Sequence, residues 1–227
     1  MKPKKFVRPA AAIAAFATLA LAGIGSSSPR VKAQDGGNGG DSRIQQGFAI
    51  APVSLNLDGK NPALVGLGSY IVNATVPCNE CHGAGPAITQ YLPGGNPYFG
   101  QPKIINPATY LGGGRDFGGV VPGSVHIISR NLTPDKTGLP IGGRTFAEFV
   151  QIIRTGVDLD NLHQACQGAV NPTCIPAPFR ADLLQVMPWP ALKDLTDYDL
   201  RAIYEYLSAV QCVAGPPAPS PLHNDCS

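Results

Sequence analysis

Three stretches of the chain repeat apolar residues at intervals of three and four, which is the period of an amphipathic helix. They span residues 62–73, 146–155 and 197–210. Pro62 suits the first turn of a helix, and Thr145 with Glu148 forms a capping box at the start of the second stretch. Thr196 is the N-cap expected for the third. The pattern therefore predicts three helices.

The first predicted helix carries two glycines, Gly66 and Gly68, in its interior. Glycine is about 1 kcal/mol less favourable than alanine inside a helix. We therefore expect another helix to cross closely at this point.

The rest of the chain is richer in turn-forming residues. Residues 83–144 carry Gly and Pro throughout and show no convincing helix or strand pattern. We expect four parts along the chain, which are a signal peptide over 1–33, a flexible N-terminal linker over 34–61, one domain over 62–212 and a Pro-rich C-terminal tail over 213–227.

The first 33 residues have the pattern of a secretory signal peptide. Four basic residues within the first eight precede a run of small and apolar residues over 10–25, and we expect cleavage after Ala33. An uncleaved anchor is the alternative, although the run is shorter than the roughly 20 residues that span a bilayer. No later stretch is long and apolar enough to cross, so we expect an exported, periplasmic protein with no transmembrane span in its mature chain.

Export changes the charge of the chain. The formal net charge is +2, but six of the 17 Lys and Arg residues and none of the 15 Asp and Glu residues lie in residues 1–33. The mature chain thus has eleven basic and fifteen acidic residues, a net charge of −4. This balance argues against nucleic acid as a partner.

The strongest chemical signal is Cys78-Asn79-Glu80-Cys81-His82, a C-x-x-C-H run. This run is the attachment signature of c-type haem, in which two thiols form thioether bonds to the porphyrin and the adjacent histidine is the proximal iron ligand. The alternatives are half of a zinc site or a redox dithiol. Zinc requires a second ligand pair of similar spacing, and the chain has no other C-x-x-C. We expect one covalently attached haem c, held by Cys78, Cys81 and His82.

The sixth iron ligand of a low-spin haem is usually Met or His. Met1 leaves with the signal peptide, so Met187 is the remaining thioether. It lies in Met187-Pro188-Trp189-Pro190, where two prolines stiffen the backbone, and Trp189 is expected to pack on the edge of the porphyrin. We expect Met187 to be the ligand. The competing candidates are His126, His163 and His223, or an open site.

With these residues aligned, the chain resembles the mono-haem cytochrome c family, and in particular the cytochrome c domains associated with periplasmic dehydrogenases. The matching segments are residues 66–72, 78–86, 131–135, 145–156, 187–190 and 195–207. The resemblance implies an all-α cytochrome c fold around one covalently attached haem, with long irregular loops and with the first and last helices crossing near Gly66 and Tyr204. It also implies that the carbonyl of Pro86 accepts a hydrogen bond from His82, and that Arg130 contacts a haem propionate.

Four further cysteines remain, and four cysteines allow three disulfide pairings. We favour the local pairs Cys166–Cys174 and Cys212–Cys226 as structural crosslinks of an exported protein.

The function we expect is single-electron transfer with redox partner proteins such as a dehydrogenase, an oxidase or another cytochrome, without catalysis by this chain. Two alternatives stay open. One is an electron-accepting subunit of a dehydrogenase. The other is a haem enzyme of peroxidase or thiosulfate-oxidising type, with an open or displaceable sixth site.

Overall fold

A computed structural model of the chain describes residues 39–85, 87–218, 220 and 222–227. The expected signal peptide at residues 1–33 lies outside this part. The described residues form one compact unit. Its first described element is helix α1, Gly39–Ile50, which packs against the next helix. The prediction of a flexible linker over 34–61 is therefore corrected for residues 39–50, because the apolar side chain of Ile44 packs onto the core.

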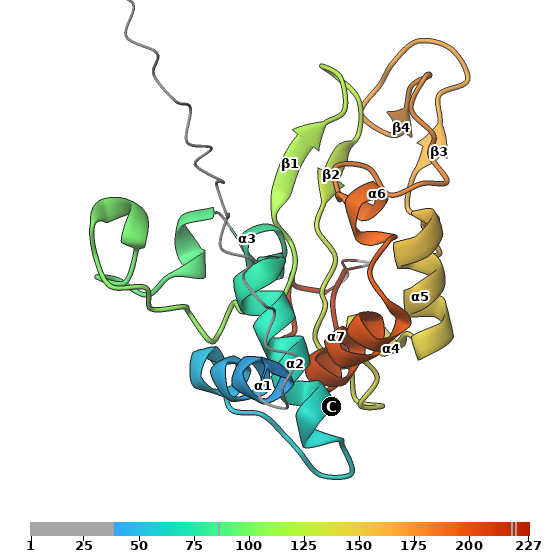
Figure 1. The fold of residues 1–227 in the computed structure, drawn as a ribbon. Coiled ribbons are helices and arrows are strands. Elements are labelled where there is room, and N and C mark those ends of the chain that lie inside the picture. The colour runs from blue at the N-terminus through green and yellow to red at the C-terminus, as the bar shows by residue number, and fades with distance from the viewer. Residues whose placement is uncertain (1–38, 86, 219, 221) are drawn as a thin grey trace, which may run out of the picture. The chain divides into compact units, whose positions relative to one another are not determined.

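The core is built on the crossing of α2, Pro62–Tyr70, and α7, Asp197–Ala209 (Figure 1). A π-helical turn, Ile71–Thr75, continues α2, and α5, Phe146–Thr155, packs on α7. These elements confirm the three predicted helices. Thr145 and Glu148 form the capping box reciprocally, and Thr196 caps α7 by accepting a hydrogen bond from the backbone N–H of Asp199.

The two glycines of α2 each permit a close contact, but with different helices. A Cβ on Gly68 would lie 1.9 Å from the carbonyl oxygen of Ala202 in α7, whereas one on Gly66 would lie 2.7 Å from Ile44 Cγ2 in α1. The close crossing is confirmed. Its position is corrected, because Gly68 rather than Gly66 faces the last helix.

Three short helices and two 3₁₀ turns complete the helical content that bears on the site and its surroundings. They are α3, Cys78–His82; the 3₁₀ turns Ala87–Gln90 and Pro97–Phe99; α4, Pro140–Gly143; and α6, Trp189–Leu192.

The prediction of an all-α fold is wrong, because the described residues also form two small sheets. Strands β1, Asp116–Gly119, and β2, His126–Ile128, pair antiparallel with an irregularity between the Asp116–Ile128 and Gly119–His126 pairs. Strands β3, Gln164–Ala165, and β4, Cys174–Ile175, pair in parallel. The backbone N–H of Val125 donates to the carbonyl of Cys174, so the two pairs lie side by side (Figure 1).

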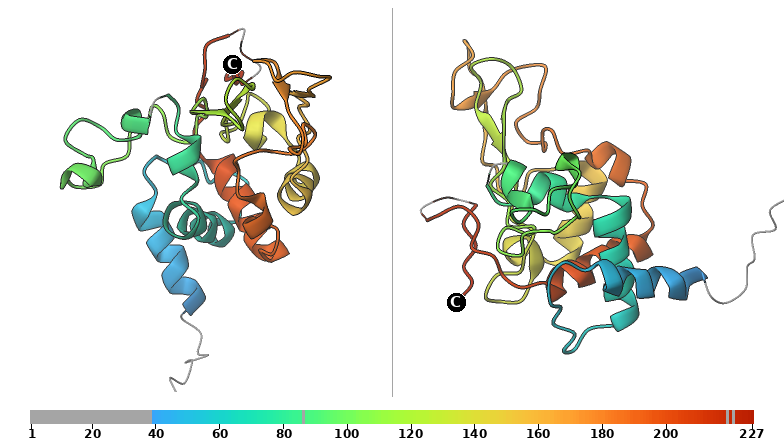
Figure 2. Two further views of the ribbon diagram at one scale, coloured as in Figure 1. Left: turned by 90° about the horizontal axis from the view of Figure 1, so that it is seen from above. Right: turned by 90° about the vertical axis from the view of Figure 1, so that its left-hand side faces the viewer.

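Both predicted disulfides are confirmed, Cys166–Cys174 and Cys212–Cys226. The second one closes the C-terminal segment, which turns back onto the body after α7 (Figure 2). The prediction of a tail over 213–227 is corrected accordingly: this segment packs on the body, where Asn224 is buried at 3% exposure. Within the part of the chain that the structure describes, no helix has the length and apolarity needed to span a bilayer.

Candidate functional site

The C-x-x-C-H run folds as the single helical turn α3. Because residues three apart share a face of a helix, Cys78 and Cys81 project on the same side. Both are free thiols, Cys78 half-buried and Cys81 exposed. Burial in apolar surroundings raises the pKa of the Cys78 thiol to about 12.

His82 closes this turn and is buried at 9% exposure. Its Nδ1 lies 2.8 Å from the backbone carbonyl oxygen of Arg130. A carbonyl only accepts, so Nδ1 carries the proton and the lone pair of Nε2 is free to bind a metal. Desolvation lowers the pKa of His82, which favours this neutral form.

This contact corrects the expected acceptor. The carbonyl of Arg130 occupies the place assigned to that of Pro86, a residue outside the described part of the chain. The reason is the path of the backbone: the N–H of Gly113 donates to the carbonyl of His82, and the N–H of Gly114 to that of Ser129, so the segment ending at Arg130 lies beside the motif.

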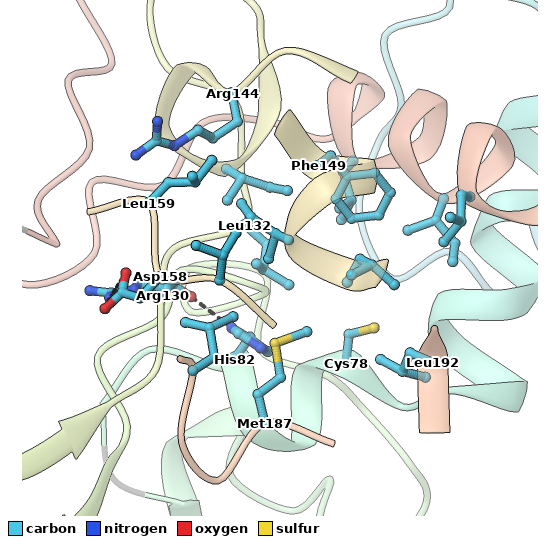
Figure 3. A pocket seen from close by; sticks show the side chains of 18 of the residues that line it. Cys78, His82, Arg130, Leu132, Arg144, Phe149, Asp158, Leu159, Met187 and Leu192 are labelled. Atoms are coloured by element: carbon cyan, nitrogen blue, oxygen red, sulfur yellow. Dashed lines mark hydrogen bonds and ion pairs between the residues drawn. The ribbon is translucent and has the colours of Figure 1, made fainter. Parts of the chain in front are cut away.

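His82 and Cys78 line a cavity that is partly open to solvent (Figure 3). Its free volume is about 90 Å³, below the about 300–1,000 Å³ of small-molecule and cofactor sites, so its walls would have to move apart to admit a large cofactor. Its walls are mostly aliphatic and come from α5, α7 and the segments beside them: Val76, Leu132, Ile141, Phe149, Ile152, Ile153, Val157, Leu159, Leu184, Leu192, Leu195, Leu200, Ile203 and Leu207.

Met187 lines the same cavity, and Figure 3 shows its thioether and the His82 imidazole both pointing into it. The half-buried Met187 follows Val186, whose φ of 68° is in the left-handed region. A β-branched residue there is strained, at a cost of about 1–3 kcal/mol. Strain of this kind persists where the surroundings require a particular chain direction, which here is the one that turns Met187 inward.

The cavity has one charged end. Arg130 and Asp158 form an ion pair there, and Arg144 pairs with Asp160. Arg130 lines the cavity, and its guanidinium is already paired with Asp158. Both arginines of this end are therefore already paired with carboxylates, which leaves no excess positive charge there for an acidic ligand. Contact of Arg130 with a haem propionate, which the resemblance implies, stays a prediction.

One further residue expected at this site lies outside the cavity wall. Trp189 is not among the cavity-lining residues: its ring lies over Gly156, and its Nε1–H donates to the carbonyl of Leu184. Tyr98 and Phe99 are exposed at 76% and 70%, and Tyr110 lies in the helical core.

The competing histidines also lie outside the cavity wall. His126 is exposed and pairs with Asp116, and the exposed His223 contacts the carbonyl of Pro216. His163 is half-buried, its Nδ1 has no hydrogen-bond partner, and desolvation lowers its pKa. Among the candidates for the sixth ligand, only Met187 lines the cavity.

The sequence did not single out Arg144, Asp158 or Asn224. Arg144 and Asp158 belong to charged clusters whose members become neighbours only in the fold. The signal that the sequence offered for them was the Asp-Leu-Asp run at 158–160. Within the described residues, no group of three or more His, Cys, Asp or Glu side chains is arranged to hold a metal ion.

A scan against protein-family models, a search of curated proteins and a search of solved structures each found no match to this chain.

Proposed function

We propose that this chain is an exported c-type cytochrome that transfers single electrons between redox proteins. One haem c would be attached through Cys78 and Cys81, with His82 and Met187 as axial ligands. The observation that carries the proposal is the shared cavity: a motif cysteine, the motif histidine and the one thioether of the described chain line the same apolar space.

The residues present fit such a group in kind. The aliphatic walls suit a porphyrin, whereas the arginines at the charged end would have to exchange Asp158 and Asp160 for its two carboxylates. The free Nε2 of His82 and the thioether of Met187 are the donor pair of electron-carrying cytochromes. When bound, the haem supplies one-electron exchange between Fe(III) and Fe(II).

The chain's own groups perform the remaining tasks. The backbone carbonyl of Arg130 accepts a hydrogen bond from the Nδ1–H of His82, which fixes the orientation of the imidazole and raises its basicity as a ligand. The aliphatic walls exclude water, and Met187 favours the reduced state relative to a second imidazole. The two disulfides fit an oxidising compartment, which supports export to the periplasm.

The test of attachment is the mass of the mature protein produced in a host that assembles c-type cytochromes. We expect the mass of one haem on the wild-type chain and none on the C78A/C81A double variant. The matched control, C166A/C174A, also removes two cysteines and keeps the haem. A wild-type chain of unmodified mass overturns the proposal.

The test of ligation compares Met187→Ala with Leu192→Ala in the haem-bearing protein. Both truncate a cavity-lining side chain, but only the first removes a donor. For Met187→Ala alone, we expect loss of the low-spin methionine spectrum and a fall in reduction potential. The fall should be a sizeable part of the roughly 0.8 V range set by axial ligands. Rapid binding of carbon monoxide by the wild-type ferrous protein would instead favour an enzyme with an open sixth site.

A further inference from the structure

The C-terminal segment after α7 buries a polar side chain against a loop that is 90 residues away in sequence. Asn224 is 3% exposed, and its backbone N–H donates to the carbonyl of Ala214. Its side-chain amide lies 2.8 Å from the carbonyl oxygen of Pro134 and 3.2 Å from Thr133 Oγ1. The Cys212–Cys226 disulfide closes the segment around this contact.

The receiving loop is itself a buried polar network. Asn131 accepts hydrogen bonds from the backbone N–H and the hydroxyl of Thr133, at 2.9 and 2.7 Å, and donates to the carbonyl of Val213 at 2.6 Å. Thr133 is fully buried and accepts from the backbone N–H of Val213 at 3.0 Å. Val213 and Asn224 of the C-terminal segment thus hold residues 131–134 in place from one side.

On its other side, this loop carries the hydrogen-bond partner of His82. Arg130 directly precedes Asn131, and its carbonyl oxygen lies 2.8 Å from His82 Nδ1. The N–H of Leu132 donates to the carbonyl of Leu111, which ties the loop to the segment beside the motif. None of these backbone groups belongs to a regular strand or helix, so this backbone hydrogen bond and the side-chain hydrogen bonds of Asn131, Thr133 and Asn224 together fix the position of the loop.

A buried polar network is unfavourable unless all its members are paired, and when they are paired it specifies one geometry. Here the specified geometry places the Arg130 carbonyl. We propose that Asn224 is a positioning residue for the proximal ligand: through Thr133 and Asn131 it holds the Arg130 carbonyl against His82. This inference rests on the proposed function, since it assigns Asn224 a role in setting the potential of the haem.

The test compares Asn224→Ala with the wild type in the haem-bearing full chain. A weaker bond from His82 Nδ1–H makes the imidazole a poorer donor, which destabilises the oxidised iron. We expect a higher reduction potential. We also expect the His82 Nδ1 proton to exchange with deuterated water several-fold to about tenfold faster, as measured by proton NMR, which is the effect of losing one hydrogen bond.

The matched control is Lys136→Ala. It removes the exposed ion pair between Lys136 Nζ and Asp225 Oδ2, which lie 2.6 Å apart, and leaves Asn224 in place. Asp225 belongs to the same C-terminal segment as Asn224. We expect wild-type potential and exchange. A shift of equal size in both variants overturns the inference, because it would follow from general loosening of the C-terminal segment.

If Asn224→Ala does not fold, Asn224→Ser, which keeps one donor, gives the same shifts at smaller size. A folded, haem-bearing variant of either kind with wild-type potential and exchange overturns this inference alone. A wild-type chain without haem overturns the proposed function, and this inference with it.

Discussion

Asp158 and Arg130 meet at the charged end of the cavity, where one guanidinium nitrogen of Arg130 lies 2.8 Å from both carboxylate oxygens of Asp158. The carboxylate is 3% exposed and the guanidinium side chain 16%. The backbone carbonyl of the same arginine accepts a hydrogen bond from His82 Nδ1–H. Arg130 therefore joins His82 to a buried charge pair, and we expect a change in the pair to affect both stability and the surroundings of His82.

We expect Asp158→Asn to destabilise the folded protein by about 2–3 kcal/mol, because it leaves a buried arginine charge with only the more distant Asp160. The uncompensated positive charge also favours the reduced iron, so the reduction potential rises. Denaturant unfolding and a redox titration measure the two effects. Asp182→Asn, which breaks an exposed pair with Arg180, serves as the control and leaves both quantities unchanged. A potential that stays constant in Asp158→Asn contradicts this account.

Val186 and Met187 give a second prediction, in which stability and ligation move in opposite directions. Val186 is 56% exposed at a φ of 68°, so Val186→Gly loses little packing and removes the strain. After the larger unfolded-state entropy of glycine is counted, we expect a net gain of about 1 kcal/mol in unfolding free energy. The freer backbone holds Met187 less firmly, so added imidazole displaces it at lower concentration.

The control for this prediction is Asn161→Gly, at another positive φ, 49°, in an exposed loop. It relieves backbone strain without touching the chain beside Met187. We expect no change in imidazole binding for this variant. Weaker imidazole binding by Val186→Gly than by the wild type would show that the strain does not hold the methionine in place.

The helices could be predicted because their signals are local. The capping box of Thr145 and Glu148 and the apolar period of α7 each lie within a few residues, and no distant contact opposes them. Met187 could be singled out by counting, since it is the one methionine in the sequence besides Met1. Its place in the cavity wall agrees with that choice.

The remainder depends on contacts that the sequence does not encode locally. Strands β1 and β2 are short and broken by an irregularity around Gly118, so they lack a period of two. The acceptor for His82 comes from Arg130, 48 residues away, and Asn224 reaches Thr133 across 91. Tyr98 and Phe99 are aromatic, yet the structure exposes both side chains to solvent, which no local pattern of the sequence indicates.

The capping box gives a prediction for pH. The backbone N–H of Thr145, and then its hydroxyl, hold the pKa of Glu148 below its ordinary value of 4.5. A lowered carboxyl pKa contributes stability that is present above pH 4.5 and is lost as the pH falls through the folded-state pKa. The difference in unfolding free energy between the wild type and Glu148→Gln should therefore shrink as the pH falls below 4.5.

The partner residue provides a check at neutral pH. Thr145→Ala should cost about 1 kcal/mol of unfolding free energy, and Thr145→Ser, which keeps the hydroxyl, should cost much less. A constant gap between the wild type and Glu148→Gln across this pH range would mean that the carboxylate contributes by packing rather than by charge.

The two glycines of α2 test whether the site depends on the helix crossing beneath it. In Gly68→Ala the new methyl group meets the carbonyl oxygen of Ala202, a backbone atom that moves only with α7, so we expect a loss of about 3 kcal/mol or more. In Gly66→Ala it meets mainly the ends of the Ile44 and Phe48 side chains, and part of the cost is offset by the about 1 kcal/mol gain in helix propensity.

The consequence for function follows from what each helix carries. Helix α7 supplies Leu200, Ile203 and Leu207 to the cavity wall, whereas α1 supplies none of the lining residues. Displacing α7 from α2 moves that wall away from α3, so Gly68→Ala should lower the yield of haem-bearing protein, measured by mass, much more than Gly66→Ala. Equal yields for the two variants would mean that the cavity forms independently of the crossing, and that the two glycines serve stability alone.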